Sequence, residues 1–202
     1  MLILTSNGLS SQSLLREIKK YIVPAMKTAV IVTTASVGYK EKDHHIPKLA
    51  EELESFNLIV NFFDFDVQPI ELLRSYDIIE LIGGNPFYLL ERMRSAKCAS
   101  IFKELIEQKI VIGISAGSLV LQKSISLIAQ FSPELNEGVN LTDFTGLNLT
   151  EVEILPHYHR LIKQIPNFEE LSKEYENRNN CKLVRIDDGQ GIFVNKTNVY
   201  II

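Results

Sequence analysis

Gly113-Ile114-Ser115-Ala116-Gly117-Ser118 is the stretch that decides the fold of this sequence. Apolar residues at 110–112 precede it, and further apolar residues at 119–121 follow it. This order predicts a buried strand that turns sharply into a helix with Ser115 at the apex, which is the G-x-S-x-G pattern of a nucleophile elbow. A Cβ at either flanking glycine would clash in so tight a turn. Because short motifs also arise by chance, a strand-to-helix turn without chemistry is the alternative.

The composition is that of a globular chain that does not bind nucleic acid. Of the 202 residues, 46% are hydrophobic and 23% are charged, and the net charge is −4 with no cluster of Lys or Arg. A length of 202 residues predicts a single domain over residues 1–202. Cys98 and Cys181 are too few for a disulfide framework or a zinc site, so we expect reduced thiols.

The sequence does not predict a membrane partner. No apolar run approaches the roughly 20 residues that a membrane-spanning helix needs. Residues 1–5 lack the basic flank and the long apolar core of a secretion signal. We therefore expect a cytoplasmic protein.

Short β-branched runs alternate with helical patterns up to residue 121. The expected strands lie at 2–4, 28–33, 58–62, 78–82 and 110–112, and the expected helices lie near 14–21, 46–53, 87–90 and 102–106. Near-continuous apolar strands in such an alternation predict an α/β fold, with a mostly parallel sheet and helices on both of its faces.

The final third of the sequence has a different character. Residues 126–154 are rich in loops, and a helix around 161–168 is interrupted near Pro166. Short strands at 183–184, 192–194 and 199–202 are separated by turns at 188–189 and 195–196. Asp187-Asp188-Gly189 lacks the further ligands of a calcium loop, so a hairpin turn is the expectation there.

Four histidines are present, and one of them is placed to serve Ser115 as a base. His157 follows Pro156 at the end of the apolar run 152–155, and open α/β sheets build their sites at the carboxyl ends of strands. An ordinary histidine pKa near 6.5 suits general base catalysis. A surface histidine is the alternative. His44 and His45 precede a predicted helix, where helix capping or solvent exposure accounts for them.

A second glycine pair, in Gly83-Gly84-Asn85, ends the strand predicted at 78–82. A glycine N–H here can point at a developing oxyanion alongside the N–H of Ala116, and such donors stabilise a transition state by several kcal/mol. A strand-to-helix turn with Asn85 as the helix N-cap explains the same residues, and both interpretations can hold together.

Three motifs, taken in this order, resemble the peptidase E family: residues 83–90, residues 113–118 and Pro156-His157. The resemblance extends over nearly the whole chain, from the Leu-Thr-Ser opening to the Asp188-Gly189 turn. It implies a flavodoxin-like fold related to class I glutamine amidotransferases. It also implies a serine peptidase that hydrolyses short peptides with an N-terminal aspartate.

The same resemblance implies the roles of individual residues. Ser115 would be the nucleophile that forms an acyl-enzyme, and His157 would be its general base. The N–H groups of Gly84 and Ala116 would form the oxyanion hole, and Asn85 would contact the substrate. A small peptide substrate is implied, with no metal and no organic cofactor.

The third member of the family's triad has no clear counterpart in this sequence. The family places an aspartate beyond the serine, and counting straight across reaches Gln130, with Glu134 as the nearest carboxylate. Gln130 and Glu134 are therefore the candidates for orienting His157, and the more distant acids are Glu137, Asp143 and Glu153. His159 stands where amidotransferase relatives carry an acid. No Arg or Lys stands out as a partner for a substrate aspartate.

The missing acid leaves a second interpretation open. A catalytically impaired protein on the same fold, which binds a small ligand or acts as a regulator, is the alternative to a serine peptidase. Glutamine amidotransferase is disfavoured, because that chemistry uses a cysteine at the elbow and neither Cys98 nor Cys181 lies in one. The sequence carries no prediction of the oligomeric state.

Overall fold

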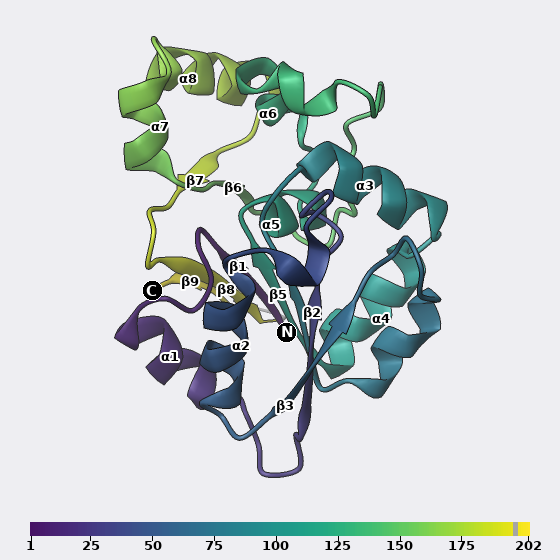
Figure 1. Ribbon diagram of the computed structural model, residues 1–202. Helices are drawn as coiled ribbons and strands as arrows, with labels where there is room; N and C mark the ends of the chain where they lie inside the picture. The colour runs from purple at the N-terminus through teal and green to yellow at the C-terminus, as the bar shows by residue number, and fades with distance from the viewer. Residues whose placement is uncertain (196–197) are drawn as a thin grey trace.

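A seven-stranded sheet forms the centre of the computed structural model, which describes residues 1–195 and 198–202 (Figure 1). The strand order is β3-β2-β4-β5-β1-β8-β9. Pairing is parallel from β3 to β1, whereas β8 is antiparallel to both β1 and β9. The strands are β1 (Leu2–Thr5), β2 (Thr28–Val32), β3 (Ile59–Phe63), β4 (Ile78–Leu81), β5 (Ile110–Ile114), β8 (Gly191–Asn195) and β9 (Asn198–Ile201). The predicted, mostly parallel α/β sheet is confirmed.

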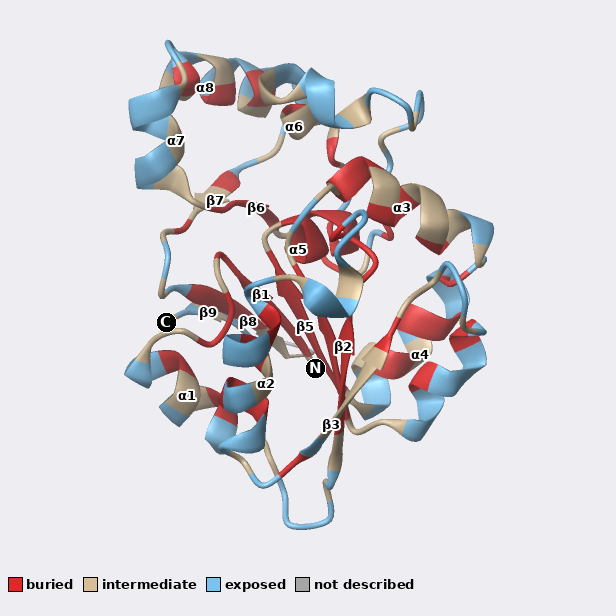
Figure 2. Ribbon diagram, viewed as in Figure 1, coloured by how far each residue is buried: buried red, intermediate tan, exposed pale blue. Residues whose placement is uncertain are grey.

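Helices cover both faces of this sheet, so its central strands are buried (Figure 2). One face carries α1 (Gln12–Lys19) and α2 (Ile46–Glu54), and the other carries α3 (Pro86–Ser95), α4 (Ala99–Gln108) and α5 (Ala116–Leu121) (Figure 1). Local sequence sets the helix starts: the Ser11 side chain caps α1, and Asn85 caps α3 ahead of a proline at its first position. Short 3₁₀ segments lie at η1 (Lys40–Lys42), η2 (Ile70–Ser75) and η3 (Pro133–Asn136).

A smaller unit, residues 153–186, lies beyond one end of the main sheet, at the top of Figure 1. It contains a parallel strand pair, β6 (Glu153–Leu155) and β7 (Leu183–Arg185), and the helices α7 (Tyr158–Gln164) and α8 (Phe168–Asn179). Helix α6 (Ser126–Phe131) packs with it. This β6–β7 unit has its own apolar cluster, formed by Leu127, Leu155, Phe168, Tyr175 and Leu183.

The second half of the chain matches the expected elements with some differences. The helix interrupted near Pro166 is two helices, α7 and α8, on either side of that proline. Residues 126–154, expected to be rich in loops, also contain α6 and η3. The expected turn at 195–196 extends outside the described residues. Within residues 1–195 and 198–202, no helix has both the length and the apolar character that crossing a membrane requires.

Glu80 is a carboxyl group in the middle of the core. It lies on the central strand β4 and is fully buried, and within the described part of the chain neither of its oxygens has a hydrogen-bond partner. Burial, together with the nearby charge of Glu52 on α2, raises the pKa of Glu80 well above its ordinary value. The folded protein therefore retains a proton on Glu80 that the unfolded chain releases.

We expect this proton to make stability fall as pH rises. From about pH 4.3 upward the unfolded chain ionises Glu80 while the folded chain does not, which costs up to about 1.4 kcal/mol per pH unit. Glu80→Gln cannot titrate, so the free energy of unfolding of the variant minus that of the parent should increase with pH. Urea unfolding at pH 5, 6 and 7 measures this difference. A difference that stays constant over the three pH values would contradict the assignment.

Candidate active site

Three adjacent parallel strands end at one edge of the sheet, and the candidate residues lie just after their carboxyl ends. Ser115 follows β5, Ser6 follows β1, and Gly83 lies just beyond β4. The order β4-β5-β1, with Thr5 opposite Ile114, places these positions side by side. This is the edge at which open α/β sheets form their binding sites.

Ser115 occupies a strained turn between β5 and α5. Its backbone angles are φ 49° and ψ −110°, a region that residues with a side chain rarely adopt. The flanking glycines permit the turn: a Cβ on Gly117 would lie 2.2 Å from the carbonyl oxygen of Leu81, and a Cβ on Gly113 would lie 2.6 Å from the Cα of Ser118. The steric reason given for the elbow glycines is therefore confirmed.

His157 lies next to Ser115, although 42 positions separate them in sequence. The distance between Ser115 Oγ and His157 Nε2 is 3.0 Å. His157 follows β6 in a left-handed conformation, φ 58° and ψ 31°, and its N–H donates to Ser6 Oγ at 3.0 Å. The side chain of His157 is only 12% exposed. Its ring lies between Ser115, which follows β5 of the main sheet, and Asp188, which follows β7.

Asp188, and not Gln130 or Glu134, is the hydrogen-bond partner of His157 on the far side of the ring. His157 Nδ1 lies 2.6 Å from Asp188 Oδ1. Gln130 lies on α6 and Glu134 on η3, and within residues 1–195 and 198–202 neither makes a hydrogen bond to His157. The expectation for the orienting group was therefore wrong.

The pairing of β6 with β7 explains how Asp188 reaches His157. These strands are parallel, with Leu155 opposite Arg185, so the residues just beyond them emerge at the same edge. His157 and Asp188 are those residues. The sequence contained a signal for Asp188, because Asp187-Asp188 follows a short apolar strand just as Pro156-His157 does. We interpreted that signal as a hairpin turn.

Ser6 joins the histidine and the carboxylate. Its hydroxyl donates to Asp188 Oδ1 at 2.6 Å, accepts the backbone N–H of His157, and lies 3.0 Å from His157 Nδ1. Asn7 Oδ1 accepts the N–H of Gly189 at 2.8 Å, so the loop after β1 also holds the loop after β7. Ser6 was not among the residues singled out from the sequence.

Burial is the main reason why His157 favours its neutral form. Burial of the ring and the positive charge of Arg160 lower its pKa, and they outweigh the opposing effect of Asp188. Burial alone would raise the pKa of Asp188, but the hydrogen bonds from Ser6 and His157 outweigh it and lower that pKa. A proton on Nδ1, donated to the Asp188 carboxylate, leaves Nε2 as an acceptor facing Ser115.

Gly84 and Ala116 present backbone N–H groups that no other described residue accepts. Gly84 has φ 137°, and a Cβ there would lie 2.3 Å from the carbonyl oxygen of Ala35. The carbonyl of Ala35 instead accepts the N–H of Asn85 at 2.9 Å. Two free N–H groups beside the serine fit the predicted oxyanion donors.

The side chain of Asn85 is the N-cap of α3. Its Oδ1 accepts the backbone N–H groups of Phe87 and Tyr88, and its Nδ2 donates to the carbonyl of Leu135 at 2.6 Å. The capping interpretation is confirmed. Contact of Asn85 with a substrate stays a prediction, since these bonds already engage both ends of its amide.

Comparison with known proteins shows the family of this chain. The model of peptidase family S51 matches residues 2–202. The chain belongs to peptidase family S51. An uncharacterized peptidase of Listeria monocytogenes is 30% identical over 174 residues, which cover 83% of this chain and 82% of that protein. A peptidase E of Shewanella amazonensis is 28% identical over 61% of this chain and 49% of its own length.

A solved structure supports the fold of this S51 peptidase. The crystal structure of a Listeria monocytogenes protein assigned to peptidase E matches with a TM-score of 0.80. The match covers 100% of this chain and 96% of that chain at 24% sequence identity. At this identity the match bears on the fold alone, and it agrees with the predicted flavodoxin-like architecture. The family match is what makes the chain a serine-type peptidase.

Neither cysteine of the S51 peptidase is available for amidotransferase chemistry. Cys98 is fully buried at the start of α4, and burial raises the pKa of its thiol to about 12. Cys181 lies two residues before β7, and burial also raises the pKa of its thiol. Ser115 therefore holds the elbow position that such chemistry gives to a thiolate.

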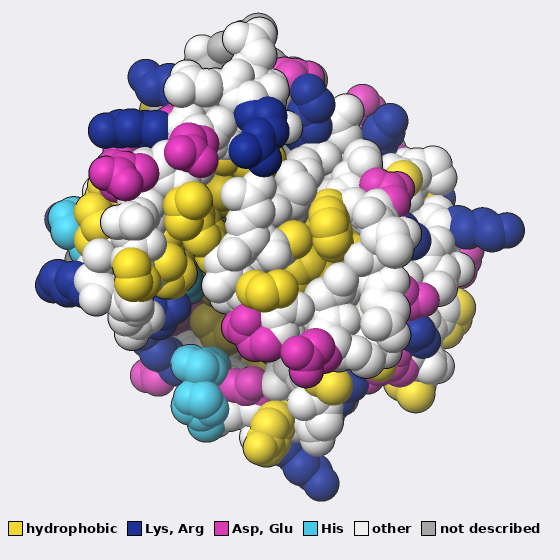
Figure 3. Space-filling view, turned by 90° about the horizontal axis from the view of Figure 1, so that it is seen from above, with side chains coloured by type: hydrophobic (Ala, Val, Ile, Leu, Met, Phe, Trp, Pro, Cys, Tyr) yellow, Lys and Arg dark blue, Asp and Glu magenta, His cyan; other side chains and the backbone are white. Residues whose placement is uncertain are grey.

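Two pockets meet at Gly84. The first, of about 240 Å³, is lined by Ser115 and His157, by apolar residues that include Leu49 and Ile114, and by the charged or polar residues Asp43, His45 and Arg160. The second, of about 530 Å³, is mainly apolar and is lined by Val37, Tyr39, Tyr88, Leu135 and Val139. Figure 3 shows a hollow beside a pair of histidine side chains on this face.

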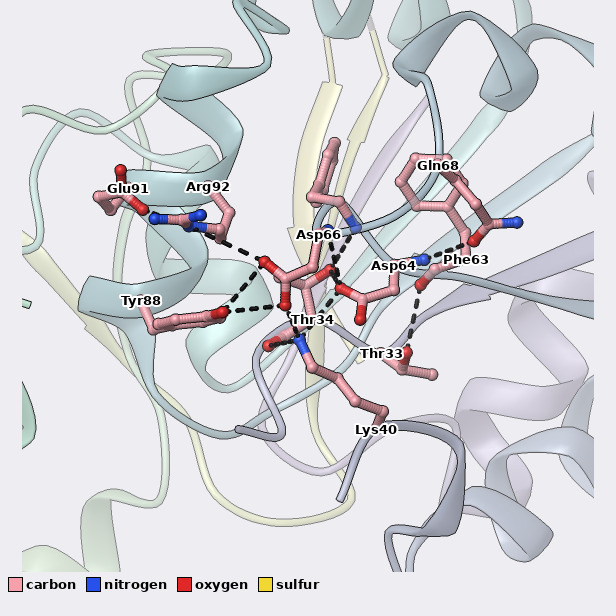
Figure 4. Close-up of polar contacts among 11 residues, drawn as sticks. Thr33, Thr34, Lys40, Phe63, Asp64, Asp66, Gln68, Tyr88, Glu91 and Arg92 are labelled. Atoms are coloured by element: carbon pink, nitrogen blue, oxygen red, sulfur yellow. Dashed lines mark hydrogen bonds and ion pairs between the residues drawn. The ribbon is translucent and has the colours of Figure 1, made fainter. Parts of the chain in front are cut away.

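A network of charged side chains fixes the loop that separates these pockets (Figure 4). Lys40 Nζ donates to Asp64 at 3.0 Å and also bonds Asp66. The hydroxyl of Tyr88 donates to the Asp66 carboxylate at 2.9 Å, and Thr34 Oγ1 donates to Asp64 at 2.8 Å. The loop after β2 is thereby tied to the loop after β3 and to α3.

Proposed function

We propose that this S51 peptidase hydrolyses short peptides through an acyl-enzyme on Ser115, with His157 as general base and Asp188 as the orienting carboxylate. The observation that carries the proposal is the unbroken series of contacts from Ser115 Oγ through the His157 ring to Asp188, at 3.0 Å and 2.6 Å. A nucleophile, a base and a carboxylate in this arrangement define the serine hydrolase mechanism on several unrelated folds.

In the first half of the reaction, Ser115 Oγ attacks the scissile carbonyl and its proton passes to His157 Nε2. The carbonyl oxygen becomes an oxyanion, which the N–H groups of Gly84 and Ala116 stabilise. Asp188 stabilises the imidazolium through Nδ1. The imidazolium then gives its proton to the leaving amine as the C–N bond breaks, and the acyl group remains on Ser115.

Water completes the cycle by the same route. His157 removes a proton from water, the resulting hydroxide attacks the ester, and Ser115 recovers its proton as the carboxylic acid leaves. The lowered pKa of His157 suits this work, because the free base is the form present at neutral pH. Ser6 supports both steps, because its hydroxyl contacts both the His157 ring and the Asp188 carboxylate.

An acidic N-terminal residue is the substrate feature that the pocket favours. Arg160 lines the pocket of Ser115, and its guanidinium makes no ion pair or hydrogen bond with another side chain in the described part of the chain. An unpaired guanidinium beside the nucleophile suits a substrate carboxylate. We therefore propose Asp-X dipeptides as substrates, and Arg160 as the residue that binds the aspartate.

The proposed setting is the cytoplasm, with small peptides as the partners. Both cysteines are free thiols, which is the usual state in a reducing compartment. The net charge of −4 argues against a nucleic-acid partner.

The alternative without turnover rested on the apparent lack of a carboxylate behind His157. The contact of 2.6 Å between Asp188 Oδ1 and His157 Nδ1 supports turnover over a purely ligand-binding or regulatory protein. Hydrolysis is the function that the geometry supports best.

Ser115 should react with a fluorophosphonate probe. The expected result is one label per chain on the intact protein and none on Ser115→Ala, because the probe traps only an activated serine. Peptide mapping of the labelled protein identifies the site. Failure of the intact protein to label above the Ser115→Ala background would overturn the serine peptidase mechanism.

Asp188→Asn should lower kcat by on the order of 10³-fold or more, since the amide neither holds the required tautomer nor stabilises the imidazolium. Gln130→Ala and Glu134→Ala serve as matched controls and should leave kcat near that of the parent. Circular dichroism checks that each variant is folded. Loss of activity in either control, with Asp188→Asn fully active, would reverse the assignment.

Arg160→Gln should raise KM for an Asp-X dipeptide about tenfold or more, equivalent to roughly 1.4 kcal/mol of lost binding, and leave KM for the matching Ala-X dipeptide unchanged. The assay is run at pH 8, where His157 is neutral in both proteins. An equal effect on both dipeptides would show that Arg160 does not read the aspartate.

A further inference from the structure

Two histidines and an aspartate gather at the rim of the Ser115 pocket, outside the catalytic residues. Asp43, His44 and His45 are consecutive and follow η1 directly, just before α2. The two imidazole rings lie with centroids 3.8 Å apart. His45 is the N-cap residue of α2, but its side chain makes no capping hydrogen bond and lies against Asp43 instead. Helix capping by this imidazole, one of the explanations expected from the sequence, was therefore wrong.

The three side chains place their donor atoms at the spacing of a metal site. His45 Nδ1 lies 3.0 Å from Asp43 Oδ1, and His44 Nδ1 lies 3.6 Å from the same oxygen. One ligand atom from each residue can be chosen so that all lie within 4.8 Å of one another. Around a tetrahedral zinc ion with bonds of about 2.05 Å, neighbouring ligand atoms are about 3.3 Å apart. The two measured separations bracket that value.

The carboxylate of this cluster is held in place. Ser36 Oγ donates to Asp43 Oδ2, and the backbone N–H of His45 donates to Asp43 Oδ1 at 2.9 Å. Such outer hydrogen bonds orient a metal-binding carboxylate. The loop itself is anchored through Lys40, three residues earlier, by the contacts to Asp64 and Asp66 in Figure 4. An ion would replace the hydrogen bond that His45 Nδ1 now makes with Asp43 Oδ1.

Access from solvent is open, because the side chains of His44 and His45 are 84% and 68% exposed. Imidazole nitrogens with one carboxylate oxygen suit zinc, cobalt or copper better than magnesium or calcium, which prefer oxygen ligands alone. Three protein ligands leave a fourth position for water or another oxygen donor.

We propose that Asp43, His44 and His45 bind a divalent transition-metal ion, such as zinc, on the wall of the Ser115 pocket. The ion changes the charge of that wall from −1, carried by Asp43, to +1. Both Asp43 and His45 line the pocket that contains Ser115, so the ion lies beside the path of any molecule that enters it. The binding itself does not depend on the proposed peptidase activity.

Binding is tested by titrating the full chain with CoCl₂ and following the visible d–d absorption of cobalt, and by calorimetry with ZnCl₂. The expected result is saturation at one ion per chain, with affinity at least tenfold weaker in His44→Ala and in His45→Ala. His159→Ala is the matched control, because His159 is also an exposed histidine beside a carboxylate, that of Asp187, but among the described residues it belongs to no group of three such ligand atoms within 4.8 Å of one another. This control should bind cobalt as the parent does.

Three outcomes would overturn the site. The first is the absence of saturable cobalt binding, and the second is equal affinity in the parent, His44→Ala and His45→Ala. The third is loss of binding in His159→Ala while His44→Ala and His45→Ala bind as the parent does. Thermal unfolding without metal establishes that the variants are folded. The fluorophosphonate label on Ser115 is scored separately in metal-free buffer, so failure of metal binding and failure of the hydrolase mechanism are told apart.

Discussion

The close approach of α5 to strands β4 and β5 is the constraint on which the site depends. The helix can lie there only because Gly117 has no Cβ to meet the carbonyl of Leu81, which would be 2.2 Å away. The chain must then reverse sharply at Ser115, and this gives the serine its positive φ. The same reversal leaves the N–H of Ala116 without an acceptor among the described residues. One packing contact thus determines both the backbone conformation of Ser115 and the availability of the Ala116 N–H as an oxyanion donor.

The sheet and its helices were predictable because their signals are long and local. The buried strands β2, β4 and β5 are near-continuous apolar runs, and α2 has apolar residues at helical spacing. The elbow at Ser115 and the histidine after Pro156 were predictable for a related reason: each has a turn residue at a fixed offset from a strand. Their proximity followed from the rule that parallel strands build sites at their carboxyl ends.

Asp188 and Ser6 were not predictable in the same way. Strands β6 and β7 are three residues long, and no periodicity in segments so short indicates that Leu155 pairs with Arg185. Counting from the serine pointed to Gln130 instead, which lies on α6. Ser6 is a single hydroxyl after a four-residue strand, and its importance comes from contacts with residues more than 150 positions away. Such contacts are a property of the folded chain alone.

The hydrogen bond between Ser6 and Asp188 makes the site sensitive to changes far from Ser115. It joins positions 182 residues apart, and the ring that they hold comes from a third place in the chain. Closing so long a loop costs chain entropy, so contacts made elsewhere in the fold must hold these three segments together. A change that loosens the docking of the β6–β7 unit on the main sheet therefore separates the base from the nucleophile and leaves the elbow itself unaltered.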